Sequence, residues 1–159
     1  MTAAHRQELY PLVEQIAKRH AIDVKLLDGI IMAESNYNPW AMRYEPKYRY
    51  IAGQADWAVK LGITSSTEKV CQQISWGMAQ MMGGTARSLG YTGHLAQLVD
   101  PQTNVTYACQ LLLRIMKRYS TVEECIAAYN AGTAYYTSHG AFVNQPYVDK
   151  VLGQMARFS

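Results

Sequence analysis

One glutamate of this chain occupies a position where the surrounding helical pattern calls for an apolar residue. Leu27, Ile31 and Glu34 recur at helical spacing, so Glu34 continues the face that would be buried. It also falls in the last turn, where the helix dipole disfavours an anion. Both effects raise the pKa of a carboxyl group, and a carboxyl that stays protonated near neutral pH can act as a general acid. The same position also suits a structural glutamate that pairs with an arginine or with helix-end amides.

Two later stretches of the sequence carry polar groups that could meet this acid. Residues 74–90 place a serine and a glutamine among methionines and glycines, and residues 127–132 end a helical pattern with a tyrosine and an asparagine. Each stretch alone is ordinary, because a methionine-rich stripe is usually core and Asn-Ala-Gly is a common helix end. Together they supply a phenol, amides and a hydroxyl that could converge on a buried acid.

Helical periodicity dominates the elements that must position these groups, and no segment alternates strongly enough to predict a strand. The pattern predicts helices over about residues 5–20, 24–35, 77–89, 101–119, 122–132 and 145–156. Asp23, Asp100 and Thr121 are the expected N-caps. Between the second and third helices lies a long segment, about residues 36–73, that is rich in Tyr and Trp and only partly helical. We therefore predict an all-α fold without bundle symmetry, in one domain spanning residues 1–159.

The composition is that of a globular protein, with 49% hydrophobic and 17% charged residues in 159. A net charge of +3 suits an anionic polymer but is too weak to indicate nucleic-acid binding. The cysteines Cys71, Cys109 and Cys125 show no CxxC spacing, so we expect buried thiols rather than a metal site or a disulfide framework. No apolar run approaches membrane-spanning length.

Five motifs follow one another in a family-specific order: ESNYNPWA, SWGMAQMMGGTA, DPQTNVTYACQLL, AAYNAG and YVDKV. This order resembles the soluble lytic transglycosylases, which have a lysozyme-like domain, over about residues 10–155. The resemblance implies cleavage of the β-1,4 bond between N-acetylmuramic acid and N-acetylglucosamine in peptidoglycan. It also implies a 1,6-anhydromuramoyl product and no metal or organic cofactor. Glu34 matches the family's catalytic acid, which would protonate the glycosidic oxygen and then serve as base toward the C6 hydroxyl.

The resemblance further implies roles for residues around the catalytic acid. Tyr129 matches the tyrosine whose hydroxyl would orient the acid, and Asn130 matches the amide beside it. Met78 and Gln80 match the motif that lines the sugar groove. Tyr147 matches a late tyrosine that borders the cleft.

The chain departs from the family pattern after the acid, because 42 residues lie between Glu34 and Gly77. The family often has a serine about nine residues after its glutamate, near the acid, and this chain has Arg43 there. We expect Ser75 to substitute for it, since Ser75 comes just before Gly77, with Ser35 as the alternative.

The extra segment, about residues 36–73, is the most aromatic part of the chain. Tyr44, Tyr48, Tyr50 and Trp57 could stack on sugar faces, because an aromatic ring pairs an apolar face with a polar edge. They could equally form a lid that packs on the groove without touching glycan. Tyr44 is our preferred substrate contact among them.

Glu45, in the same segment, leaves a second chemistry open. If it faces the cleft near Glu34, it could bind substrate or hold a water molecule, and the enzyme would then be a muramidase that hydrolyses the glycosidic bond. Alternatively, Glu45 lies at the surface and pairs with Arg43 or Lys47.

A wall-cleaving enzyme without a signal peptide resembles phage products, either an endolysin or a virion-associated enzyme, and a secretion-system enzyme is a third option. We expect synthesis in the cytoplasm and action on the cell wall after pore-dependent release or as a virion component. The expected partner is the peptidoglycan glycan strand, bound by a monomer without membrane insertion. A non-catalytic glycan-binding or structural protein is the competing class, but it would be expected to have lost Glu34 or Tyr129.

Overall fold

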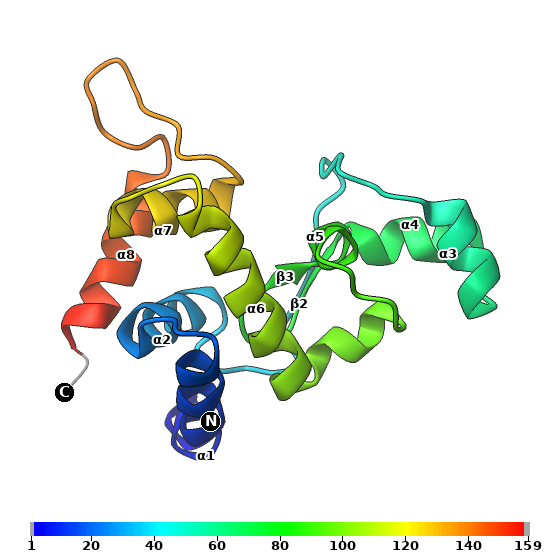
Figure 1. The fold of residues 1–159 in the computed structure, drawn as a ribbon, viewed down its shortest axis with the longest axis horizontal. Coiled ribbons are helices and arrows are strands. Elements are labelled where there is room, and N and C mark those ends of the chain that lie inside the picture. Colours follow the sequence, from blue (N-terminus) through cyan, green and yellow to red (C-terminus); the bar gives the residue numbers. More distant parts are fainter. Residues whose placement is uncertain (1, 158–159) are drawn as a thin grey trace.

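The computed structural model describes residues 2–157, and it describes the side chains of residues 5–157. Helices dominate, in two groups with a small sheet between them (Figure 1). The larger group contains α1 (Thr2–Arg19), α2 (Val24–Glu34), α6 (Pro101–Met116), α7 (Val122–Ala131) and α8 (Gln145–Ala156). The smaller group contains α3 (Gln54–Leu61), α4 (Ser65–Gln72) and α5 (Gly83–Ser88), and the short helix η1 (Leu95–Val99) precedes α6. The prediction of a mainly α-helical fold is confirmed.

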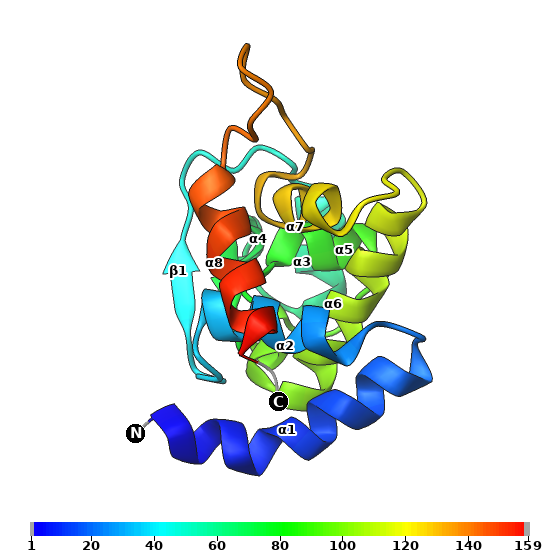
Figure 2. The same cartoon turned by 90° about the vertical axis from the view of Figure 1, so that its left-hand side faces the viewer.

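Helix α2 lies at the centre of the larger group, packed against α1 and α8 (Figure 2). Asp23 caps its start by accepting a hydrogen bond from the backbone N–H of Lys25 at 2.8 Å. Its leucines and isoleucines are buried, so the helix is held by apolar packing rather than by intrinsic propensity. The chain leaves α2 through Asn36 and Tyr37, which both have positive φ, so the helix ends where the sequence indicated.

Close approach of α2 and α8 depends on a glycine. A Cβ added at Gly29 would lie 2.8 Å from Cγ of Met155 and 3.2 Å from the carbonyl oxygen of Val151, both in α8. Only glycine lets the two backbones come this near without displacing one of them. The middle of α2 and the second half of α8 therefore lie side by side.

The sheet is antiparallel, with strands β1 (Met42–Tyr44), β2 (Ile74–Trp76) and β3 (Met81–Met82) in that order. From the sequence we predicted no strand and a helix over residues 77–89. That helix is wrong for residues 77–82, which form a turn and β3, since α5 begins only at Gly83. Strands of two or three residues are too short to show a period-two pattern, so the sequence carries no local signal for them.

The turn between β2 and β3 is held from α6 by a buried side chain. Asn104 accepts a hydrogen bond from the N–H of Ala79 at 2.8 Å and donates to the carbonyl of Trp76 at 2.7 Å. A Cβ on Gly77 would lie 2.5 Å from the Asn104 amide nitrogen, and Gly77 has a φ of 70°. The turn also holds Gln80 at a φ of 50°, a conformation that a non-glycine residue adopts only when its surroundings impose it.

The aromatic segment folds mainly as α3 and α4, in agreement with the partly helical prediction. A buried ion pair joins α4 to α5, with Arg87 donating to both carboxylate oxygens of Glu68 at 2.8 and 3.0 Å. The centre of the Trp57 ring lies 4.3 Å from the Arg87 guanidinium carbon, so this tryptophan of α3 packs against α5. Tyr48 contacts Thr85 through its hydroxyl at 3.1 Å. These two aromatic residues thus hold the segment against α5.

The other helix ends agree with their sequence signals. Thr121 and Glu124 form the expected capping box of α7, and Asp100 caps α6, which ends at Met116 rather than near residue 119. The three cysteines are free; two of them are buried and Cys71 is partly buried. Within the part of the chain that the structure describes, no helix combines the length and apolar character needed to cross a membrane.

Candidate active site

Glu34 is the last residue of α2, and its side chain is partly buried against α8. Tyr147, in the first turn of α8, donates its hydroxyl hydrogen to Oε1 of Glu34 at 2.6 Å. Burial raises the pKa of Glu34, and the hydrogen bond from Tyr147 opposes part of that rise. The net pKa stays above the ordinary value for glutamic acid. This is the direction that a general acid requires.

Two cations also act on this carboxyl group, and sequence reasoning did not select either of them. Lys150 and Arg43 both lower the pKa of Glu34, and both effects are smaller than that of burial. Lys150 follows Tyr147 by one helical turn, and its ammonium group donates to the carbonyl of Ala33. The spacing of Tyr147 and Lys150 on one helix face was the available signal, since residues three apart are neighbours on a helix.

Tyr129 lies close to the acid but bonds to the backbone. Its hydroxyl donates to the carbonyl of Ala79 at 2.8 Å and approaches the sulfur of Met81 at 3.8 Å. Burial and the charge of Glu34 raise the pKa of Tyr129 well above the ordinary value for tyrosine. The resemblance implies that the Tyr129 hydroxyl orients Glu34, but in the structure the hydroxyl that bonds to Glu34 is that of Tyr147. Tyr129 instead fixes the turn between β2 and β3 next to the acid.

The hydroxyl that we expected beside the acid lies elsewhere. Ser75, in the centre of β2, donates to Oε1 of Gln80 at 2.8 Å and lies 3.3 Å from the carbonyl of Arg43. Ser35 donates to the carbonyl of Met78 at 2.7 Å. Neither serine has a hydrogen bond to the acid. Both hydroxyls already have partners in the sheet and its turn, so their role here is to hold that turn.

The remaining residues to which the resemblance assigns a role, Met78, Gln80 and Asn130, make contacts within the protein. Met78 is fully buried in the main core, where its side chain cannot line a groove. Gln80 is only partly buried, and its amide nitrogen donates to the carbonyls of Ala41 and Gly77 at 3.2 and 2.9 Å. Asn130 is exposed at the end of α7, and its Oδ1 accepts a hydrogen bond from Asn144 at 2.9 Å.

Glu45 forms an ion pair with Arg43, one of the two arrangements that the sequence left open. The side chain of Arg43, in β1, is 75% exposed and that of Glu45, just after β1, is 35% exposed, so the pair lies at the surface. Tyr44, between them, is exposed on the same strand. Arg43 therefore pairs with Glu45, and its charge also lowers the pKa of Glu34.

A family model for the transglycosylase SLT domain matches residues 11–143, which is most of the chain. The matched range includes Glu34, Ser75, Gln80 and Tyr129, and it ends before Tyr147. The observed helices, with the acid at the end of α2 and the tyrosine of α7 beside it, agree with this match. The chain therefore belongs to the transglycosylase SLT domain family, whose lysozyme-like domains act on peptidoglycan.

Proposed function

We propose that this protein is a lytic transglycosylase that cleaves the β-1,4 bond between N-acetylmuramic acid and N-acetylglucosamine. The observation that carries the proposal is the single carboxyl group of Glu34, with its raised pKa and its hydrogen bond from Tyr147. The residues that act on this carboxyl among those described are a phenol and two cations, and none of them is a second carboxylate. A reaction that needs one acid and no second carboxylate fits this arrangement.

In the first step, Glu34 transfers its proton to the glycosidic oxygen, and the bond from that oxygen to C1 of the muramoyl sugar breaks. Because Tyr147 donates to Oε1, the transferable proton is carried by Oε2. The carbonyl oxygen of the muramoyl N-acetyl group assists by approaching C1 as positive charge develops there. The carboxylate left behind is stabilised by the Tyr147 hydrogen bond and by the charges of Lys150 and Arg43.

In the second step, the same carboxylate takes the proton from the C6 hydroxyl while O6 forms a bond to C1. The product is a 1,6-anhydromuramoyl end, and Glu34 returns to its protonated form without consuming water. The two steps need opposite protonation states of one group. A raised pKa favours the first step, and the hydrogen bond and cations that limit the rise favour the second.

Hydrolysis by a muramidase would need a second carboxylate to hold the attacking water. The pairing of Glu45 with Arg43 supports a surface role for that carboxylate and so favours the transglycosylase reaction. A purely glycan-binding role would not require a carboxyl group with a raised pKa.

The test is mass spectrometry of the products from purified peptidoglycan digested in ¹⁸O-labelled water. We expect anhydromuramoyl ends without ¹⁸O from the wild type and no cleavage by Glu34→Gln. Glu123→Gln, which changes an exposed glutamate of α7, is the matched control and should behave like the wild type. Reducing ends that carry ¹⁸O would establish a muramidase instead, and equal cleavage by Glu34→Gln would remove the proposed acid.

A further inference from the structure

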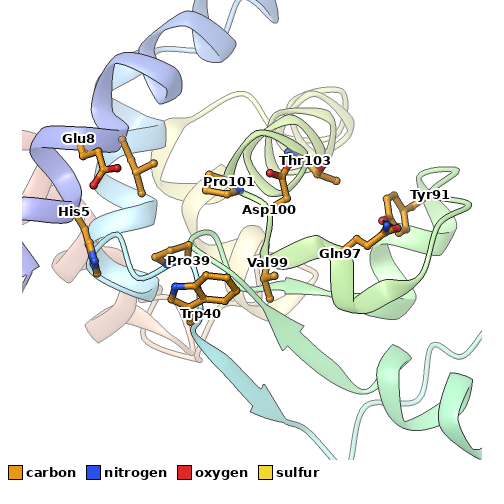
Figure 3. Close-up of a pocket in the computed structure, with 11 residues that line it drawn as sticks. His5, Glu8, Pro39, Trp40, Tyr91, Gln97, Val99, Asp100, Pro101 and Thr103 are labelled. Atoms are coloured by element: carbon orange, nitrogen blue, oxygen red, sulfur yellow. Dashed lines mark hydrogen bonds between the residues drawn. The ribbon is translucent and has the colours of Figure 1, made fainter.

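A pocket of about 680 Å³ lies between α1, the turn that follows α2, η1 and the start of α6 (Figure 3). Leu9, Pro39 and Val99 give it apolar walls, and Trp40 lies beside them. Among the described residues that line it, none belongs to the cluster around Glu34. The catalytic reaction proposed above therefore leaves this pocket without a role.

Trp40 is the unusual member of the lining, because it is large, apolar and 71% exposed. Its position is nevertheless fixed. Its backbone N–H donates to Oδ1 of Asn38 at 3.0 Å, and the carbonyl of the following residue, Ala41, accepts from the N–H of Gly77 at 2.7 Å. An exposed indole on a backbone held in this way offers an apolar face on which a ligand can stack.

Polar side chains line the same pocket, and several of their hydrogen-bonding groups have no partner among the described residues. Gln97 accepts from the hydroxyl of Tyr91 at 3.3 Å, which leaves its amide N–H groups for a ligand. Asp100 uses Oδ2 to cap α6. The carboxylate of Glu8 makes no hydrogen bond with the described residues. The pocket thus offers carboxylate acceptors, amide donors and an exposed indole within one concave surface.

This chemistry selects the class of ligand. Hydroxyl groups donate to carboxylates and accept from amides, while the C–H face of a sugar ring packs on an indole and on apolar walls such as Pro39 and Val99. An anionic ligand, by contrast, would meet the negative charges of Glu8 and Asp100. The carboxylates of a peptide stem are disfavoured for the same reason, and an uncharged saccharide is favoured.

We propose that the pocket around Trp40 is a second, non-catalytic site that binds a neutral N-acetylhexosamine segment of a glycan strand. This inference rests on the proposed function only because the glycan strand cleaved at Glu34 would also supply the segment bound at Trp40. Such a site would hold the enzyme on an insoluble wall between cleavage events.

The test is an NMR titration of the wild-type protein, followed at the indole N–H signals of its three tryptophans. Trp40→Phe assigns the Trp40 signal by removing it. With N,N′,N″,N‴-tetraacetylchitotetraose as the probe, we expect the Trp40 signal to shift and saturate with a Kd on the order of 1 mM. The indole of Trp76, which donates to the carbonyl of Cys71 at 3.0 Å, should not move.

Two glutamine variants provide a matched comparison on neighbouring elements. Gln97→Ala removes a side chain that lines the pocket, and we expect the Kd to rise about fivefold. Gln102→Ala removes an exposed side chain outside the lining and should leave the Kd unchanged. Equal affinities of both variants would overturn the assignment to this pocket.

A Trp40 signal that does not respond to the oligosaccharide would also overturn the proposal. So would a signal that responds only to a muramoyl peptide, because the ligand would then be the stem. These failures are distinguishable from a failure of the proposed function. Anhydromuramoyl products can form although the Trp40 indole signal does not shift with the oligosaccharide. Conversely, that signal can shift in a protein that releases no such products.

Discussion

Tyr147 and Glu34 are 113 positions apart in the chain, yet the phenol of one donates to the carboxyl group of the other at 2.6 Å. The contact joins the first turn of α8 to the last turn of α2. It gives the acid a fixed orientation and moderates the rise in its pKa that burial causes. Both properties depend on one phenolic hydrogen, and removing that hydrogen is the most direct test of the site.

Tyr147→Phe should lower kcat/KM about tenfold or more, because a hydrogen bond to a charged group contributes about 1.5–3 kcal/mol. The pKa of Glu34 should rise further, since the Tyr147 hydrogen bond lowers it. A general acid is active when protonated, so the alkaline limb of the pH–rate profile should move to higher pH. Tyr135→Phe, at an exposed tyrosine, is the control. An unshifted limb would mean that Tyr147 acts on structure alone.

Glu34→Gln should make the protein more stable at neutral and alkaline pH, and by the proposed mechanism it should also abolish cleavage. The raised pKa of Glu34 means that the folded state holds the proton more tightly than the unfolded state, whose group titrates near 4.5. The wild type therefore loses stability as the pH rises from 4.5 through the folded-state pKa, and glutamine avoids that loss. Thermal unfolding should show equal Tm values below pH 4 and a Tm about 3 °C higher for the variant at pH 8. A higher Tm at acid pH instead would contradict the assigned direction.

Gly29→Ala should destabilise the protein and weaken catalysis together. The added Cβ would press on Met155 and Val151 and so displace α8, which carries Tyr147. We expect a loss of about 1–3 kcal/mol in the free energy of unfolding, measured with urea, and a fall in activity. Gly153→Ala is the matched control, because a Cβ there meets nothing within 4 Å. The control should be neutral or slightly stabilising, since alanine favours a helix.

Arg87→Met should lower the free energy of unfolding, measured with urea, by about 3–5 kcal/mol, because it leaves the buried carboxylate of Glu68 without its counter-charge. Adding Glu68→Gln to this variant should restore part of the loss. Lys18→Met, which breaks the exposed pair with Glu14, should change stability by less than about 1 kcal/mol. If Arg87→Met and Lys18→Met lowered the free energy of unfolding equally, burial would not make the Glu68–Arg87 pair more important for stability than an exposed pair.

The features that could be predicted from sequence are those with a local cause. Asp23, Asp100 and Thr121 cap helices through hydrogen bonds that span two or three residues, so their signals lie in a short window. Glu34 could be found because its spacing placed it on an apolar face. The family motifs also indicated which residues lie near Glu34, but they did not predict the hydrogen bonds that those residues make.

The rest could not be predicted because its causes are distant in the chain. The sequence pattern predicts a helix at residues 77–80, but these residues form a turn. Asn104 in α6 and Tyr129 in α7 hold that turn through hydrogen bonds to the backbone of Ala79. The roles of Tyr129 and Tyr147 depend on which of their hydroxyl groups bonds to Glu34 once α7 and α8 have packed. From the sequence, Arg43 is interpreted as a replacement for serine and as a candidate partner of Glu45. Its effect on the pKa of Glu34 joins residues of β1 and α2, so no local pattern indicates it.

The packing of α8 against α2 also has a consequence during synthesis. A ribosome translates Glu34 long before Tyr147, so a nascent chain carries the acid while the helix that orients it is still absent. The face of α2 at Gly29 has no partner until α8 emerges. An incomplete chain therefore lacks the contact between Glu34 and Tyr147, and the assembled site forms only after translation has passed α8.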